Sequence, residues 1–178
     1  TLLADAGADV TMWGRRAAVV DQINAGCNEA YLPDHRLPAG IRATTDPAAA
    51  AEGADHVVLA VPSQTLRDNL GRWGGAIPSD ASVVSLMKGV ELGTTRRMSE
   101  VITEVAEVEP ERVVVVSGPN LAREIVERHP AASVVACVDD ERAEAVAAAC
   151  ATQTFRPYTT TDVVGAEIGG AVKNVIAL

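Results

Sequence analysis

The stretch RVVVVSGPNLAREI (residues 112–125) carries the pattern that decides the fold. Its four consecutive valines predict a strand that is buried on both faces, as is typical of parallel sheets. Gly118 and Pro119 then predict a turn, and residues 121–128 predict a helix. A strand, a turn and a helix in succession form the repeating unit of an α/β protein.

The same alternation continues along the chain in both directions. Strands are predicted at residues 8–13, 41–45, 56–61, 82–87, 112–118, 132–138 and 154–159. Helices are predicted at residues 1–7, 15–26, 46–53, 63–73, 94–108, 121–128, 140–151 and from about 162 onward. Residues 31–40 are expected to form an irregular loop. The pattern predicts a doubly wound, Rossmann-type α/β fold with a parallel sheet and right-handed crossovers.

Composition restricts the classes of function. The chain has 178 residues, about one domain, and 48% of them are hydrophobic, which suffices for a core. A net charge of −9 argues against nucleic acid and anionic membranes as partners. No apolar run is long enough to insert into a membrane. Three unevenly spaced cysteines are interpreted as thiols of a reducing cytoplasm, and no metal site is expected.

The ends of the chain predict that it is a fragment. Residues 1–7 resemble the last turns of a helix, and the chain stops inside another helix. In a dinucleotide-binding fold, the element before such a first helix would be the first strand with its glycine-rich turn. We therefore expect an internal piece of a longer protein, which should be inactive by itself.

The residues that follow each strand are the candidates for a site, because ligands of this fold class bind at the carboxyl ends of the strands. Arg15 and Arg16 follow the strand at 8–13, where an acidic residue would favour NAD. Guanidinium groups can pair with a 2′-phosphate instead, which favours NADP. The alternative is that both arginines simply begin a helix at the surface.

Lys88 and the turn at 117–120 follow two further strands. Lys88 is expected to donate a hydrogen bond into the crevice, although a loop lysine at the surface is the alternative. Backbone N–H groups after Gly118 and Pro119 would suit an anion or a carbonyl oxygen. Asn120 is expected to cap the following helix, and this role does not exclude the first.

Lys173 lies in the apolar stretch GGAVKNVIAL (residues 169–178). The chain has two lysines and thirteen arginines, so a lysine in this place calls for a chemical reason. A partly buried lysine can exchange protons near neutral pH, whereas arginine cannot. Glycines at 165, 169 and 170 allow close packing of this helix. The alternative is a lysine whose amine reaches past a helix surface into water.

Five stretches together resemble the bacterial NAD(P)-dependent glycerol-3-phosphate dehydrogenase family. They are MWGRR (12–16), NEAYLPDHRLP (28–38), KGVELGT (88–94), SGPNLAREI (117–125) and DVVGAEIGGAVKNVIAL (162–178). The resemblance implies interconversion of dihydroxyacetone phosphate and sn-glycerol 3-phosphate with NADPH or NADH, to supply phospholipid synthesis; with the arginines at 15 and 16, NADPH is the expected preference and NADH remains possible. It implies that Lys173 is the catalytic proton donor and acceptor.

The resemblance also assigns binding residues. The substrate-binding residues that it implies are Lys88, Gly118, Asn120 and Asn174. The cofactor-binding residues that it implies are Arg15, Arg16, Tyr31, Lys88 and Ala122. The family often has Ser or Thr where this chain has Asn120, whose amide can still donate a hydrogen bond.

The implied domain organisation is a nucleotide-binding domain at 1–160 and the first helix of an all-helical substrate domain at 161–178. A homodimer is compatible with this organisation. Two rival functions stay open: a β-hydroxy acid dehydrogenase or ketopantoate reductase of the same architecture, and a non-enzymatic dinucleotide sensor. The SGPN turn argues against the first, and a sensor would not need Lys173.

Overall fold

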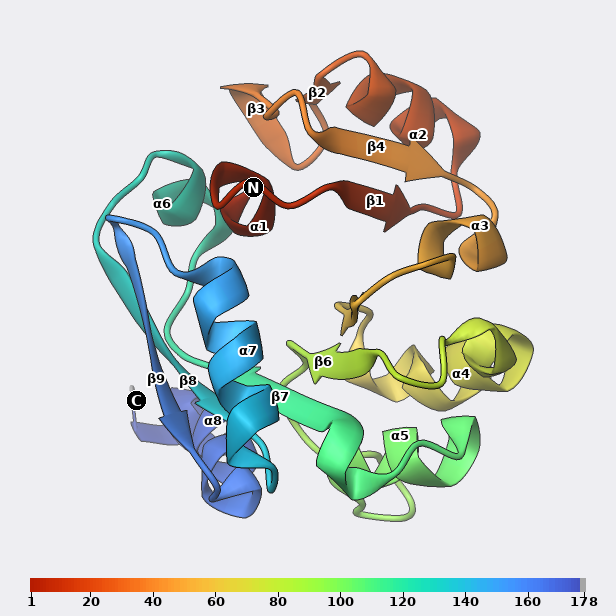
Figure 1. Ribbon diagram of the computed structural model, residues 1–178, viewed down its shortest axis with the longest axis vertical. Helices are drawn as coiled ribbons and strands as arrows, with labels where there is room; N and C mark the ends of the chain where they lie inside the picture. The colour runs from red at the N-terminus through yellow and green to blue at the C-terminus, as the bar shows by residue number, and fades with distance from the viewer. Residues whose placement is uncertain (177–178) are drawn as a thin grey trace.

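The computed structural model describes residues 1–176, with side chains through Lys173. Its helices are α1 (Leu2–Asp5), α2 (Ala17–Asn24), α3 (Pro47–Ala51), α4 (Leu66–Trp73), α5 (Met98–Ala106), α6 (Ala122–Val126), α7 (Asp140–Cys150) and α8 (Val163–Ile176). Its strands are β1 (Val10–Trp13), β2 (Cys27–Asn28), β3 (Leu32–Arg36), β4 (Ile41–Thr44), β5 (His56–Leu59), β6 (Ser82–Ser85), β7 (Val113–Ser117), β8 (Ala131–Ala136) and β9 (Phe155–Thr160). Helices and strands alternate as the sequence predicts (Figure 1).

The main sheet has the strand order β5-β6-β7-β8-β9. Its pairs are parallel, except that β7 and β8 run antiparallel. The predicted Rossmann-type α/β fold with a mostly parallel sheet is confirmed, and only the β7–β8 pair of this sheet departs from parallel pairing, because an apolar run looks the same in either strand direction. Strands β1 and β4 form a separate parallel pair, which lies with α2 at one end of the molecule (Figure 1).

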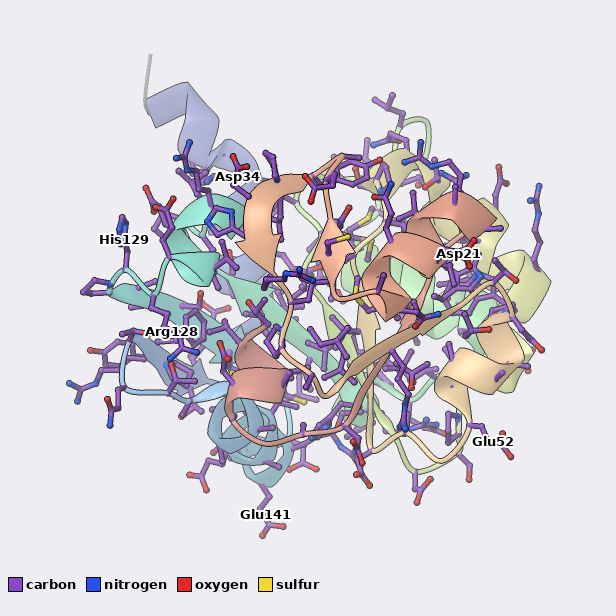
Figure 2. All side chains as sticks on the ribbon, turned by 90° about the horizontal axis from the view of Figure 1, so that it is seen from above. Asp21, Asp34, Glu52, Arg128, His129 and Glu141 are labelled. Carbon is purple, nitrogen blue, oxygen red and sulfur yellow. The ribbon has the colours of Figure 1, made fainter. Side chains whose placement is uncertain are left out.

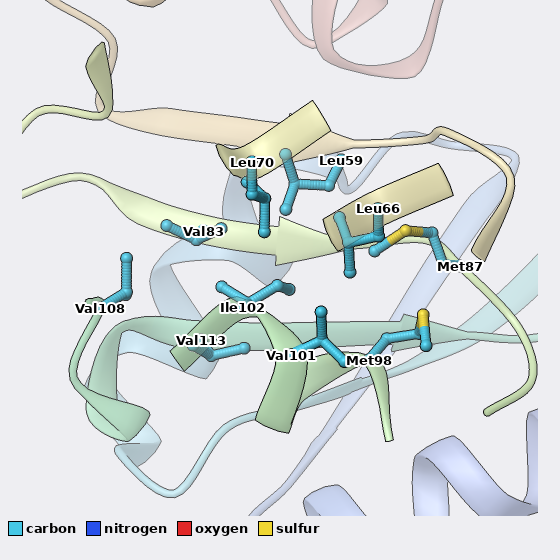
Figure 3. Packing of buried hydrophobic residues seen from close by; sticks show 10 residues of the cluster. All are labelled: Leu59, Leu66, Leu70, Val83, Met87, Met98, Val101, Ile102, Val108 and Val113. Atoms are coloured by element: carbon cyan, nitrogen blue, oxygen red, sulfur yellow. The ribbon is translucent and has the colours of Figure 1, made fainter. Parts of the chain in front are cut away.

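The valine runs are buried on both faces, as the sequence predicts. Val83 and Val113 lie in a cluster with residues of α4 and α5, and Figure 3 shows this cluster, in which Leu66 and Ile102 are fully buried. Their neighbours Val84 and Val114 face the other side of the sheet and pack against α7. Because successive side chains of a strand point to opposite faces, a continuous valine run fills both layers of core.

Two local predictions differ from the structure. The expected loop at 31–40 contains β3, which pairs with β2 in an antiparallel hairpin. Pro33 and the positive φ of Asp34 (66°) hide this strand from a pattern search. Helix α5 begins at Met98 rather than at Thr94, because Thr95 has a φ of 57° and the preceding segment turns back on itself.

Charged side chains cover the outside of the molecule. Figure 2 shows Asp21, Glu52 and Glu141 pointing away from the ribbon, and all three are exposed. This distribution agrees with the net charge of −9. Among residues 1–176, the structure contains no helix with the length and apolarity that a membrane span requires.

Candidate active site

Lys88 follows β6, a strand whose four residues are all buried. Its half-buried side chain reaches to the end of the neighbouring strand β7, where Nζ donates a hydrogen bond to the carbonyl oxygen of Gly118 at 2.5 Å. Two parallel strands thus place their carboxyl ends together, and the lysine links them. The structure places Lys88 where the sequence predicts it, inside the crevice rather than on the surface.

Gly118 lies where the chain leaves no room for a side chain. A Cβ atom at this position would lie 2.5 Å from Ser133 Oγ and 2.9 Å from the carbonyl oxygen of Ala132, both on β8. The turn after β7 is therefore pressed against the neighbouring strand. This contact fixes the carbonyl oxygen that accepts the hydrogen bond from Lys88.

Asn120 does not cap α6, and that prediction is wrong. The N-cap residue of α6 is Leu121, without a side-chain cap, and the Asn120 amide instead donates to Ser133 Oγ at 2.5 Å. Its Oδ1 atom is buried and has no hydrogen-bond partner among the described residues. A buried acceptor without a partner costs about 1–3 kcal/mol, so this atom is suited to accept a hydrogen bond from a ligand.

Helix α8 brings Lys173 to the same place. Asp162 Oδ1 accepts a hydrogen bond from the backbone N–H of Gly165 at 2.8 Å and so begins the helix. A Cβ atom on Gly170 would lie 2.6 Å from Ser117 Oγ and 4.0 Å from Lys88 Cγ. Without a side chain at 170, the helix can approach both residues.

The two lysines act on one another. Partial burial lowers the pKa of Lys88 below its ordinary value, and the positive charge and hydrogen bonding of nearby Lys173 lower it further. Both lysines of the chain therefore lie together at the carboxyl ends of β6 and β7. The lysine pair, as we call Lys88 and Lys173, is the most chemically specific feature of this region.

A cavity of about 490 Å³ opens beside the lysine pair. Four predicted site residues line it: Lys88, Gly118, Asn120 and Ala122. Most of the remaining wall is apolar and comes from many elements of the fold, including β1, β5 and α7, through residues such as Met12, Val58 and Val146. A mostly apolar cavity with a few convergent polar groups is the usual form of a small-molecule site.

The other predicted cofactor residues lie outside this cavity lining. Arg15 and Arg16 are exposed just after β1, and Tyr31 is exposed between β2 and β3. Arg16 donates a hydrogen bond to the Tyr31 hydroxyl at 2.8 Å, and its guanidinium lies 5.8 Å from the centre of the ring. Asn174 belongs to α8, but its side chain lies outside the described residues.

Two sets of groups could bind a dinucleotide: the arginines after β1 and the residues of the Gly118 turn. The guanidinium groups after β1 can pair with a phosphate, and the buried oxygen of Asn120 can accept a hydrogen bond. The 178 residues contain no GxGxxG turn, which is the element that binds a pyrophosphate in this fold class.

Sequence reasoning missed one buried charge. Glu167 of α8 is 8% exposed and accepts hydrogen bonds from Arg97 and Ser99. The signal that could have revealed it is a single carboxylate within the otherwise uncharged stretch at 163–172.

A mostly parallel α/β sheet with polar groups such as Lys88 and the Gly118 turn gathered at the carboxyl ends of its strands is the architecture of dinucleotide-dependent dehydrogenases. The family model described as NAD-dependent glycerol-3-phosphate dehydrogenase N-terminus matches residues 1–143. The chain belongs to this glycerol-3-phosphate dehydrogenase family.

Individual relatives agree with the family match. The chain is 61% identical to "Glycerol-3-phosphate dehydrogenase [NAD(P)+]" of Streptomyces griseus over 99% of its own length and 53% of the relative. It is 57% identical to the protein of that name, with the suffix 2, from Mycobacterium tuberculosis, with the same coverage. The chain thus spans about half the length of the curated relatives that it matches.

Solved structures show the same fold. Glycerol-3-phosphate dehydrogenase of Coxiella burnetii has a TM-score of 0.89 and 30% identity, and the match covers 99% of this chain and 54% of the other. A ketopantoate reductase from Ralstonia eutropha has a TM-score of 0.68 and 23% identity, over 93% and 53%. The second likeness shows the fold alone.

Proposed function

We propose that this chain forms most of the nucleotide-binding domain, at 1–160, and the first helix of the substrate domain, at 161–178, of a longer dehydrogenase. The proposed reaction interconverts dihydroxyacetone phosphate and sn-glycerol 3-phosphate with NADPH or NADH. The observation that carries the proposal is the lysine pair beside the cavity, with Lys88 bonded to the carbonyl oxygen of Gly118.

Lys173 is the proposed proton carrier of the reaction. It protonates the substrate oxygen when the ketone is reduced, and it removes the hydroxyl proton in the reverse direction. A bound nicotinamide supplies or accepts the hydride. At this place, partial burial and the nearby positive charge of Lys173 lower the pKa of Lys88.

Lys88, Gly118, Asn120 and Asn174 are proposed to bind and orient the substrate. Lys88 can reach both the Gly118 turn and the cavity, and Asn120 offers a buried oxygen that lacks a protein partner. These groups exclude water and hold the ketone in one orientation. The two amines also supply positive charge for a phosphorylated, anionic substrate.

Arg15 and Arg16 are proposed to bind the adenosine end of NADPH, with Tyr31 and Ala122 as further contacts and Lys88 shared between cofactor and substrate. The hydrogen bond from Arg16 to Tyr31 restricts the guanidinium at the end of β1. This arrangement supports a site for a 2′-phosphate, and NADPH is therefore the proposed preference over NADH.

The proposed setting is the cytoplasm, where sn-glycerol 3-phosphate would supply phospholipid synthesis, with a homodimer as the proposed assembly. A sister β-hydroxy acid dehydrogenase is the second candidate, because it shares the fold, but no residue of the cavity favours it over the phosphorylated substrate. A dinucleotide sensor would not require the lysine pair.

The proposal is tested with the complete dehydrogenase that contains this chain. Reduction of dihydroxyacetone phosphate is followed by the loss of NADPH absorbance, with ketopantoate and a 3-oxo acid as competing substrates. We expect turnover with dihydroxyacetone phosphate alone. Turnover with either competitor instead would support the sister enzymes, and binding of NADPH without any turnover would support the sensor.

A further inference from the structure

The buried carboxylate of Glu167 makes an unusually complete set of contacts for a residue on a helix surface. Its side chain is 5% exposed and pairs with Arg97, whose Nη1 donates to Oε2 at 2.8 Å. The hydroxyl of Ser99 donates to Oε2 at 2.6 Å, and the backbone N–H of Ser99 donates to Oε1 at 2.9 Å. Both carboxylate oxygens are therefore occupied.

All three donors belong to the beginning of α5. Arg97 is the N-cap residue of this helix, and Ser99 lies in its first turn. The N-terminus of a helix favours negative charge, because its backbone N–H groups have no partner within the helix. Glu167 thus caps α5 from α8, although the two residues of the ion pair are 70 positions apart in sequence.

Arg97 and Glu167 each lie on the same stretch of chain as one residue of the lysine pair. The segment between β6 and α5 ends at Arg97 and contains Lys88, three positions after the last residue of β6. On α8, Gly170 lies one turn after Glu167, and a Cβ atom there would lie 2.6 Å from Ser117 Oγ and 4.0 Å from Lys88 Cγ. Lys173 follows Gly170 by one turn. The Glu167 contacts therefore set where this helix lies relative to Lys88.

We propose that Glu167 is a positioning residue, whose buried ion pair with Arg97 fixes the rotation and depth of α8 and thereby holds the amine of Lys173 beside Lys88. An apolar side chain could fill the same space but would allow the helix to rotate. Three directed hydrogen bonds to a rigid helix end allow one orientation. The catalytic consequence rests on the proposed function, whereas the positional claim does not.

The two lysines of the chain allow a direct test. Labelling lysine with ¹³C at Cε gives two resonances in this 178-residue chain, and each is titrated by NMR. In Glu167→Gln, we expect the Lys88 midpoint to shift upward, because Lys173 moves away and no longer lowers the pKa of Lys88. Simple removal of a negative charge would shift the midpoint downward, so the sign separates the two explanations.

The control variant removes another mostly buried charged side chain, far from the lysine pair. Arg112 has a side chain 13% exposed and donates to the carbonyl oxygens of Ala81 and Pro78, at the opposite end of the strands. Arg112→Met should lower the melting temperature and leave both lysine midpoints unchanged. If Glu167→Gln does not fold, Ser99→Ala removes one hydroxyl donor and should give a smaller upward shift.

The complete dehydrogenase provides the second readout. A displacement of about 1 Å can cost about 10²-fold in rate, so Glu167→Gln should lower kcat by about that factor, with a smaller change in KM. The proposal is overturned if Glu167→Gln leaves the Lys88 midpoint unchanged or lowers it. It is also overturned if Arg112→Met raises this midpoint as much as Glu167→Gln does. An upward shift in a protein without dehydrogenase activity would instead reject the proposed function and retain the positioning role.

Discussion

At the scale of single residues, Gly118 is a position where the structure leaves no room for a side chain. Its missing side chain allows the turn after β7 to lie against Ser133 and the backbone of Ala132. Gly118→Ala should lower the free energy of unfolding by about 1–3 kcal/mol, as overpacking typically does. Urea unfolding measures this difference.

Gly71 is the matched control for Gly118. It lies in α4, and a Cβ atom there would meet nothing within 4 Å. Gly71→Ala should stabilise the protein by up to about 1 kcal/mol through helix propensity. Equal effects of the two alanines would mean that the close approach at Gly118 does not constrain the turn.

Arg15 tests the proposed preference for NADPH. Arg15→Ala in the complete dehydrogenase should raise the KM for NADPH about tenfold and leave the KM for NADH nearly unchanged, because one charge-assisted hydrogen bond to phosphate contributes about 1.5–3 kcal/mol when desolvated and less when exposed. Arg72→Ala, an exposed arginine on α4, is the control. If Arg15→Ala raises the KM for NADPH and the KM for NADH equally, Arg15 does not bind the 2′-phosphate.

The residues of the lysine pair could be predicted, whereas the residue that supports them could not. Lysine is rare in this chain; Lys88 follows a strand end, where this fold class binds ligands, and Lys173 lies in the apolar stretch of the last helix. Glu167 stands out in the sequence only as the single carboxylate of the stretch at 163–172, and its pairing with Arg97 depends on a contact across 70 residues. The local sequence around Asn120 predicts a helix cap, whereas its actual partner, Ser133, lies 13 residues further along the chain.

At the scale of elements, the segment between β6 and α5 is held by Arg67 of α4 and by Gln64, which lies just before α4. Arg67 donates to both oxygens of Glu91, at 2.8 and 3.0 Å, and the amide of Gln64 bonds to the backbone of Val90 and Leu92. Because the segment contains Lys88, these contacts fix its path away from the cavity.

The ion pair of this segment predicts a pH dependence. Hydrogen bonds from Arg67 and Thr94 lower the pKa of Glu91 from 4.5 to about 2. A carboxylate with a depressed pKa stabilises the folded state above its ordinary pKa, and this contribution is lost as the pH falls toward the folded value. Glu91→Gln should therefore be less stable than the wild type at neutral pH, and the difference should shrink between pH 4.5 and pH 2.

Urea unfolding at several pH values measures this difference. Glu52→Gln is the control, since Glu52 is exposed and has no ion pair among the described residues. Its stability difference from the wild type should stay nearly constant across the same range. A constant difference for Glu91→Gln as well would show that the ion pair does not contribute to folding.

The order of elements could be predicted because apolar runs and helix signals are local. Asp46 and Pro47 begin α3 as expected, with Asp46 accepting hydrogen bonds from the backbone of Ala48 and Ala49. Strand direction is not local, so the antiparallel pairing of β7 with β8 could not be predicted. The β2–β3 hairpin was missed because its second strand contains a proline.

At the scale of the whole molecule, the charges are distributed unevenly. The net charge is −9, and acidic side chains such as Asp21, Glu52 and Glu141 point outward. Both lysines lie beside the cavity instead, with Lys88 in its lining. The proposed anionic substrate would thus meet positive charge at the lysine pair on a molecule whose net charge is negative.

The measurement that tests the central claim most directly is the oxidation of sn-glycerol 3-phosphate by the complete dehydrogenase with Lys173→Arg. Arginine keeps the positive charge but cannot accept the hydroxyl proton. We predict that kcat falls by about 10²- to 10⁴-fold, the usual contribution of a general acid or base, while the melting temperature stays near that of the wild type. Lys88→Arg should affect KM more than kcat. A near-normal oxidation rate for Lys173→Arg across pH would show that this lysine only provides charge, and would contradict its role as the proton carrier.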